Sequence, residues 1–541
     1  MRITRAAALA AAAALIAAGV TACGGSDKSD GEATELKIET PAPTGDAGAI
    51  TWAVYRETQT LDPIFSFDYP ENTALYTMCE SVLRQQPDGT IGPGLATDVT
   101  SPDPLTYEIT LRDGITFWDG SPLTADDVVY SLERARDAKL GGFYAAVFSR
   151  VTSMEATTPT TVTIKLSDAD YWLRGELSGT PGVIYSKAFA EAKGKDFGSV
   201  NAGTMCTGAF KLDSWKTGQG VTVVRNDDYW DTELAPKVEQ ITIIGAPDDA
   251  TITSGLQTGE IDGVYAQQLT TLDQLRSSAD VKVYEGPSYI ADAFIVSNFE
   301  GPLGDVRVRQ ALSLAVDRAG LIQATWKGAA QLPRTLSNPG MWGYSRDVFQ
   351  QAWDELADPA VDLDAAKALI EEAGATGKKI RIGTSSEIVG LNTEASALKS
   401  AAESIGLEAE LVSLSAASYI NFFIDAKVRE GVDGFFTTNY GDYADPAALY
   451  STVVLPDGSQ NYSGYANAEV TEAMEAARAE ADDAKRAEYV VAAQKIMVDE
   501  LPWIPMSAPS SVLIMHKDIT GAPASFQYMF GPWAAQIGAA G

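Results

Sequence analysis

A carboxylate between two tyrosines is the feature of this sequence best placed to bind a small molecule. The segment 439–446 reads Asn-Tyr-Gly-Asp-Tyr-Ala-Asp-Pro, and it follows Gly434–Thr438, whose apolar and β-branched composition predicts a buried strand. Ligands of open parallel sheets bind beyond the carboxyl ends of the strands, where Asp442 would lie between Tyr440 and Tyr443. A carboxylate among aromatic rings suits an ammonium group. The alternative is an Asp-rich turn that only caps the next helix.

Alternating strand and helix patterns precede this segment and predict the sheet that positions it. Strand patterns cover Lys379–Ile382, Leu407–Leu411 and Val432–Thr438, and helical patterns cover Ala395–Ile405 and Tyr419–Val428. The order strand, helix, strand, helix, strand predicts a right-handed parallel arrangement.

The residue inventory excludes most enzyme classes. A single histidine, His516, rules out a His-Glu-x-x-His zinc site. The sequence contains no Gly-x-Ser-x-Gly nucleophile motif and no glycine-rich phosphate-binding motif after a strand. A glycosidase needs only two carboxylates, so that class stays open in a chain with 73 Asp and Glu residues. We expect no cofactor and no metal site.

The length and charge of the chain set further limits. A chain of 541 residues is too long for one hydrophobic core, so we expect two or more lobes. The chain carries 40 basic and 73 acidic residues; without residues 1–22, which include Arg2 and Arg5, the balance is 38 − 73 = −35. Such a surface repels nucleic acid and anionic lipid, so we expect no nucleic-acid partner.

The first residues are typical of a targeting segment. Two arginines precede the apolar run Ala6–Val20, and small residues precede Cys23, so residues 1–22 are interpreted as a lipoprotein signal peptide with Cys23 as the lipidation site. The alternative is an ordinary signal peptide with a chance cysteine. Residues 23–48 are rich in Gly, Ser, Asp, Glu, Thr and Pro, which predicts a flexible tether.

Two further cysteines, Cys79 and Cys206, are expected to form a disulfide, because an exported protein folds in an oxidising compartment. Two free buried thiols are the alternative. Neither cysteine has the spacing that a metal site needs.

Five blocks of the sequence then carry a resemblance. They are Leu111–Val128, Gly203–Trp215 followed by Arg225–Trp230, Gly259–Asp262, Asp305–Leu312 with Ala315–Arg318, and Asp442–Pro446. In this order they resemble the family 5 extracytoplasmic solute-binding proteins of peptide, nickel and related ABC importers, the dipeptide- and oligopeptide-binding type.

The resemblance implies an α/β fold of two lobes, like the large class C, type II periplasmic binding proteins, with a hinge between the lobes. It places lobe I at residues 49–295 and 505–541 and lobe II at residues 296–504, with the ligand enclosed by hinge closure. In peptide-binding relatives the residue at the position of Asp442 takes the α-ammonium of the ligand. Phe67, Tyr69 and Tyr144 match positions that line the pocket, although each is equally compatible with the core of lobe I.

One position departs from the pattern of peptide binders, which commonly have Trp where this chain has Asn439. Either Tyr440 replaces the missing aromatic surface, or the pocket prefers a more polar solute.

The sequence is therefore interpreted as a lipid-anchored, monomeric binding protein that hands short peptides to the transmembrane subunits of an ABC permease. Within the same class the alternatives are an oligosaccharide or a nickel chelate. From another class the alternative is a secreted glycosidase or a cell-wall adhesion module.

Overall fold

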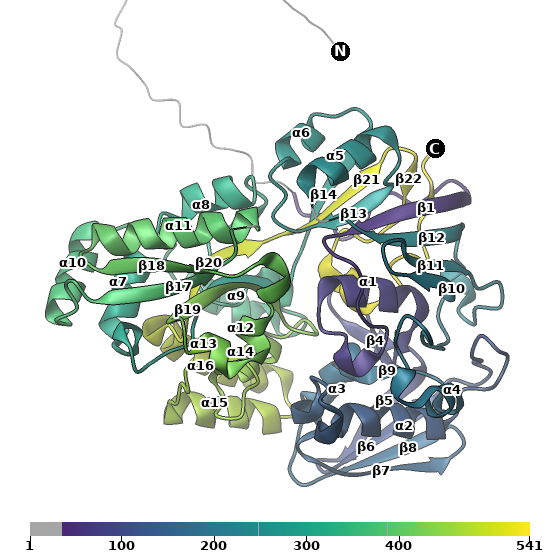
Figure 1. Cartoon of the computed structure of the whole chain (residues 1–541). Coiled ribbons are helices and arrows are strands. Elements are labelled where there is room, and N and C mark those ends of the chain that lie inside the picture. Colours follow the sequence, from purple (N-terminus) through teal and green to yellow (C-terminus); the bar gives the residue numbers. More distant parts are fainter. Residues whose placement is uncertain (1–34, 247, 387) are drawn as a thin grey trace, which may run out of the picture. The chain divides into compact units, whose positions relative to one another are not determined.

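Two large β-sheets define two lobes of the chain (Figure 1). The computed structural model describes residues 35–246, 248–386 and 388–541. Lobe I contains a seven-stranded sheet in the order β10-β11-β12-β1-β13-β21-β14. Lobe II contains a six-stranded sheet in the order β16-β20-β15-β19-β17-β18.

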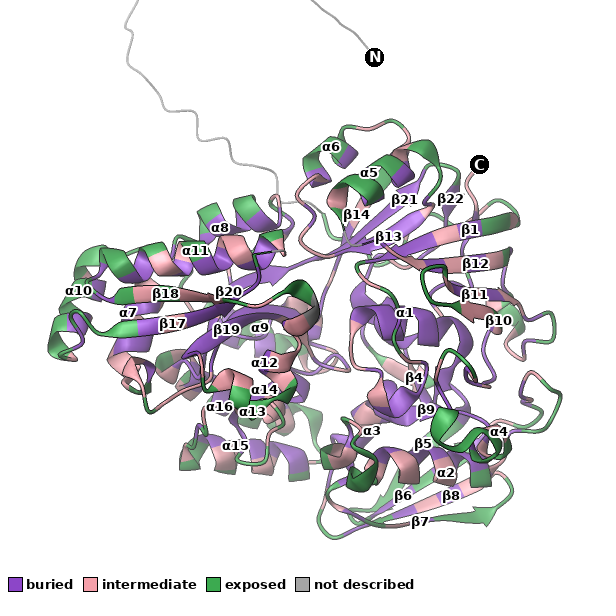
Figure 2. Ribbon diagram, viewed as in Figure 1, coloured by how far each residue is buried: buried purple, intermediate pink, exposed green. Residues whose placement is uncertain are grey.

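The sheet of lobe I is built on β1, whose Ile50, Trp52 and Val54 are buried. β1 pairs in parallel with β12 and β13, and the other neighbouring strands pair antiparallel. β21 is buried along its whole length, and Figure 2 shows it in purple. The strands are β1 (Ala47–Val54), β10 (Phe210–Lys216), β11 (Gly220–Arg225), β12 (Val238–Gly245), β13 (Gly263–Ala266), β14 (Val281–Gly286) and β21 (Ser511–His516).

A second, four-stranded sheet extends lobe I and has its own hydrophobic core. Helix α2 (Ala125–Arg136) covers this sheet with Val128 and Leu132, which are fully buried. The helix begins at Thr124, whose backbone N–H and hydroxyl both donate to Asp127 Oδ2, at 3.0 and 2.8 Å. The strands are β5 (Ala96–Asp103), β6 (Thr106–Leu111), β7 (Val151–Thr158) and β8 (Thr161–Leu166).

The sheet of lobe II is mixed. β17 pairs in parallel with β18 and β19, as the strand and helix pattern predicted, whereas β15 pairs antiparallel with both β19 and β20. Helix α11 (Val389–Ser404) connects β17 to β18. The strands are β15 (Ile290–Val296), β16 (Ala330–Gln331), β17 (Lys379–Thr384), β18 (Glu408–Ser413), β19 (Gly434–Tyr440) and β20 (Trp503–Pro509).

The helix predicted over 419–428 is two short helices, α12 (Asn421–Ile424) and α13 (Ala426–Arg429). Asp425 separates them, because its extended backbone ends α12 and its carboxylate accepts the N–H of Lys427, in the second residue of α13. A side-chain cap of this kind competes with the continuation of a helix.

The chain crosses between the lobes at two places. It leaves the sheet of lobe I after β14 and enters the sheet of lobe II at β15, and it returns between β20 and β21. The expected boundaries at 295/296 and 504/505 fall inside β15 and β20. By strand pairing, lobe I comprises the described residues within 36–286 and 511–541, and lobe II those within 290–509.

The last part of the predicted tether is paired with lobe I. The Lys37 N–H donates to Glu285 O at 2.7 Å, and the Thr44 N–H donates to Ala539 O at 2.9 Å. Bridges at Glu39 and Gly45 continue this pairing up to β1. The tether interpretation is thus corrected for residues 36–48: composition does not prevent an extended backbone from finding partners. Cys23 and residues 1–22 lie outside the described residues.

Cys79 and Cys206, which the sequence analysis paired, are joined by a disulfide with a Cα–Cα distance of 5.0 Å. Both are buried in the main core, and the bond connects the end of α1 (Tyr69–Met78) to the segment before β10.

A pair of buried carboxyl groups lies where the lobes join. Asp292 on β15 is 1 % exposed and accepts hydrogen bonds from Trp326 Nε1, at 3.2 Å, and from the hydroxyl of Ser507. Glu394 on α11 is 0 % exposed, contacts Asp292, and accepts from Nε2 of Gln268 of lobe I at 2.5 Å. Burial raises the pKa of both groups, and the charge of Asp292 raises that of Glu394 further. Burial therefore favours a protonated carboxyl group in this pair over the ionised form.

Replacing Glu394 with Gln should remove a pH dependence of stability. Carboxyl groups with raised pKa values stabilise the fold at low pH, and this contribution is lost as the pH rises through their folded pKa, which is about 6 for Asp292. A Gln amide can donate to Asp292 and accept from Gln268 at every pH. We expect urea unfolding to show that the free energy of unfolding of Glu394→Gln, relative to that of the wild type, rises by about 1–3 kcal/mol between pH 5 and pH 8. Glu403→Gln, at an exposed position of the same helix, is the control; the same pH slope in all three proteins would contradict the shared proton.

Candidate functional site

The end of β19 delivers the carboxylate that the sequence singled out. Asp442 lies two residues beyond the last residue of β19, at the carboxyl end of a strand that pairs in parallel with β17. The next acid has a different role: Asp445 caps α14 (Pro446–Val454), and its Oδ1 accepts the N–H of Ala447 at 2.8 Å. The helix cap at Asp445 and Pro446 that the alternative interpretation expected is therefore confirmed, and Asp442 lies outside it.

Three hydrogen bonds connect the two lobes around Asp442. Gln85 Nε2 donates to the backbone oxygen of Asp442 at 2.6 Å. The Tyr440 hydroxyl donates to Phe67 O at 2.7 Å, and the Tyr69 hydroxyl donates to Thr438 O at 3.2 Å. Asp442 is therefore placed at the contact between lobe I and lobe II.

The carboxylate of Asp442 has no cationic partner among the described residues. Its side chain is half-buried, and burial raises its pKa to about 7. Within residues 35–246, 248–386 and 388–541, nothing donates a hydrogen bond to the carboxylate or forms an ion pair with it. Burial, and to a smaller extent the charge of Asp442, raises the pKa values of the Tyr76, Tyr144 and Tyr440 hydroxyls.

The other candidate residues fall into two groups. Tyr69 and Tyr440 pack edge to face with ring centroids 5.0 Å apart, Phe67 packs on Phe143 at 4.1 Å, and buried Tyr144 donates to Ser66 O at 2.6 Å. These four candidates meet where the lobes touch. Asn439 does not join them, because its amide donates to Gln460 within lobe II.

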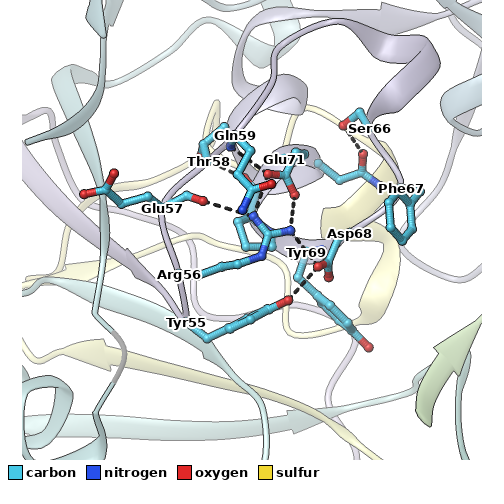
Figure 3. A network of polar contacts seen from close by, with 12 residues as sticks. Tyr55, Arg56, Glu57, Thr58, Gln59, Ser66, Phe67, Asp68, Tyr69 and Glu71 are labelled. Atoms are coloured by element: carbon cyan, nitrogen blue, oxygen red, sulfur yellow. Dashed lines mark hydrogen bonds and ion pairs between the residues drawn. The ribbon is translucent and has the colours of Figure 1, made fainter. Parts of the chain in front are cut away.

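An ion-pair network holds the segment that carries Phe67 and Tyr69 (Figure 3). Arg56 bonds to both oxygens of Glu71 and to Asp68 Oδ2, each at 2.7 Å, and Tyr55 donates to the same Asp68 oxygen at 2.6 Å. The other Asp68 oxygen accepts the N–H of Tyr69, the first residue of α1, at 2.7 Å. The network therefore fixes the residues that lobe I presents to lobe II.

The space beside Tyr69 is small in this conformation. A cavity of about 10 Å³ is lined there by the β1 end and by Thr73, Tyr265, Gln267 and Tyr528. All the lining residues belong to lobe I, and this volume holds about one water molecule.

Sequence reasoning missed the residues that lobe I places over Asp442, among them Gln85 and Glu176. Gln85 lies 357 residues from Asp442 along the chain, and no local pattern marks either residue. Among the described residues, no helix is both long and apolar enough to cross a membrane, and no three His, Cys, Asp or Glu side chains are grouped as metal ligands would be.

Known proteins resemble the chain over most of its length. The family model of the bacterial extracellular solute-binding proteins, family 5, matches residues 90–461. A probable D,D-dipeptide-binding periplasmic protein of Escherichia coli is 27 % identical over 498 residues, which cover 88 % of this chain and 91 % of that protein.

Solved structures show the same two-lobed fold, which confirms the fold class expected from the resemblance. A periplasmic binding protein of Helicobacter pylori in complex with the peptide STSA has a TM-score of 0.77 at 22 % identity, covering 92 % of this chain and 98 % of that one. A binding protein of Agrobacterium tumefaciens in complex with agropinic acid has a TM-score of 0.79 at 22 % identity, covering 91 % and 98 %. With more than half of its length matched by the family model, the chain belongs to the bacterial extracellular solute-binding proteins, family 5.

Proposed function

We propose that this solute-binding protein binds short peptides between its lobes and delivers them to the permease of an ABC importer. Asp442 forms an ion pair with the α-ammonium group of the peptide, and Cys23 carries the lipid that holds the protein at the outer face of the membrane. The observation that carries the proposal is the Asp442 carboxylate, enclosed at the contact of the lobes without a cationic partner among the described residues.

The physical argument is one of charge compensation. A carboxylate that is removed from water without a partner destabilises the closed form by about 3–5 kcal/mol. A bound ammonium group removes this penalty, so closure is linked to the presence of an amine. The charge of Asp442 contributes to the raised pKa values of Tyr144 and Tyr440. The rings of these tyrosines add a favourable surface for a cation.

The relatives support a peptide as the ligand, and they also show that proteins of this fold bind other kinds of ligand. The named relatives include D,D-dipeptide-binding and glutathione-binding proteins, and one structural neighbour holds a tetrapeptide. Another neighbour holds agropinic acid, so the fold alone does not select peptides. The unpartnered carboxylate favours a ligand with an amino group over an uncharged oligosaccharide.

Ligand screening tests the proposal. Protein purified from cells is first examined by native mass spectrometry for co-purified peptide. Thermal shift assays then compare trialanine, maltotriose and a nickel–histidine chelate. A ligand at 100 times its Kd stabilises the folded form by about 2.7 kcal/mol, which is a shift of several degrees. Stabilisation by the sugar or the chelate, with none by any peptide, would overturn the peptide assignment.

Peptide affinity is expected to depend on pH. Because burial raises the pKa of Asp442 to about 7, the carboxyl is protonated below that pH and must lose its proton to pair with an ammonium group. Affinity for trialanine should therefore fall up to tenfold for each pH unit below 7, measured by isothermal titration calorimetry between pH 5 and pH 8. An affinity that is constant over this range would contradict the ion pair.

A further inference from the structure

A segment of lobe I containing two glycines lies directly against Asp442 and Tyr443. A Cβ atom on Gly175 would stand 2.3 Å from Tyr443 Cε2, and a Cβ atom on Gly179 would stand 2.9 Å from the backbone oxygen of Asp442. Both distances are too short for a side chain, so the absence of side chains at these two positions is what allows the lobes to meet here. Glu176, the last residue of α3 (Leu173–Glu176), lies between the two glycines.

Glu176 is a second enclosed carboxyl group at this contact. Burial, and after it the charge of Asp442, raises the pKa of Glu176 well above its ordinary value. No residue in the described part of the chain donates a hydrogen bond to its carboxylate or forms an ion pair with it. The two carboxyl groups come from opposite lobes, so lobe closure brings like charges together.

Two arginines near these carboxyl groups form ion pairs with other residues. Arg478 Nη2 bonds to Asp170 at 2.5 Å, and Arg486 bonds to Asp483 and lies in the field of Asp445. The charge of Arg478 lowers the pKa of Glu176, but within the described residues neither arginine forms an ion pair with Glu176 or Asp442. Like charges enclosed together oppose closure unless positive charge arrives between them.

The hydroxyl oxygen of Tyr443 is a second indication of a ligand site at this contact. The hydroxyl of Tyr443 is buried, in a residue only 4 % exposed, and has no hydrogen-bond partner in the described structure. Burial, and after it the charge of Glu176, raises the pKa of this hydroxyl, and its ring lies against Gly175, next to Glu176 in the chain. A buried hydroxyl without a partner is rare, and a ligand N–H beside Glu176 would satisfy its oxygen.

We propose that Glu176 determines specificity by binding a second cationic group, so that the preferred ligand is a peptide whose first residue has a basic side chain. The α-ammonium pairs with Asp442 of lobe II, and the side-chain cation pairs with Glu176 of lobe I and contacts the Tyr443 hydroxyl. The ligand thus joins the lobes through two ion pairs. This inference rests on the proposed peptide function and adds the class of the first residue to it.

Calorimetry with three peptides tests the inference. Lys-Ala-Ala carries the second charge at the first residue, norleucine-Ala-Ala has the same chain without the charge, and Ala-Ala-Lys moves the charge to the other end. The wild type should bind Lys-Ala-Ala at least tenfold more tightly than either of the others. Glu176→Gln should reduce this ratio to about one, while Glu155→Gln, at an exposed position of lobe I, should keep it.

The outcomes separate this inference from the proposed function. If Lys-Ala-Ala and norleucine-Ala-Ala bind the wild type equally, or if Glu176→Gln keeps the preference, Glu176 has no role in specificity although peptides bind. If none of the three peptides binds, the proposed function itself fails. The melting temperature of each variant confirms that it is folded, and no hydrogen bond to Glu176 is lost in Glu176→Gln.

Discussion

Replacing Asp442 with Asn is expected to weaken the binding of a peptide with a free amino end by at least about thirtyfold. Removing one partner of a buried charge pair destabilises a complex by about 2–5 kcal/mol, and 1.4 kcal/mol corresponds to a factor of ten in Kd. The side chain forms no hydrogen bond with the part of the chain that the structure describes, so the variant should fold normally. Isothermal titration with trialanine measures the loss.

N-acetyl-trialanine is the matched control for this experiment, because it has the same length and no ammonium group. The wild type should bind it weakly, and Asp442→Asn should change its affinity less than twofold. If the substitution weakens both peptides equally, Asp442 acts through the shape of the site, and the proposed ion pair is wrong.

Removing the disulfide should be the substitution with the largest effect on folding. Cys79 and Cys206 are separated by 127 residues, and closing a loop of about 100 residues is expected to stabilise a protein by roughly 4–5 kcal/mol in the chain-entropy model, against 2–5 kcal/mol for typical native disulfides. Both sulfur atoms lie in the core, so the double variant Cys79→Ser/Cys206→Ser also buries two hydroxyls there. Urea unfolding should give a loss of at least about 3 kcal/mol.

Reduced wild-type protein separates the two contributions, because it lacks the bond but keeps the sulfur atoms. It should lose most of the stability that the double variant loses. An oxidised wild type and a double variant that unfold at the same urea concentration would contradict the stabilising role of the bond.

Local pattern was enough to predict the elements that carry Asp442. The strands β17, β18 and β19 follow from their apolar alternation, and their parallel pairing follows from the helical segments between them. The antiparallel pairing of β15 with its two neighbours could not be predicted from local patterns. β15 pairs with β19 and with β20, which lies more than 200 residues later, and no local signal records such pairing.

The same limit applies to the candidate site. Asp442 was found because its position after a strand has a physical meaning and because the surrounding motif resembles a family. Glu176 was not found, because its significance comes from Gly175 and Gly179 allowing lobe I to approach lobe II. A carboxylate in a chain with 73 acidic residues becomes informative only when the fold shows that it is enclosed and unpaired.

Asn439 occupies the position at which peptide binders commonly have Trp. Neighbouring residues of a strand point to opposite faces, so Asn439 and Tyr440 cannot serve the same surface. The amide of Asn439 bonds to Gln460 within lobe II, whereas Tyr440 reaches lobe I through Phe67. Tyr440 thus supplies an aromatic ring at the contact of the lobes, but on a different face from the one that position 439 occupies.

A crystal structure of the protein with a bound tripeptide that has a free amino end tests the central claim most directly. The account predicts that the α-ammonium nitrogen lies about 2.7–2.9 Å from an oxygen of Asp442, with both lobes in contact with the peptide. A peptide whose amino end lies away from Asp442, or one that binds to the outer surface of either lobe, would contradict it.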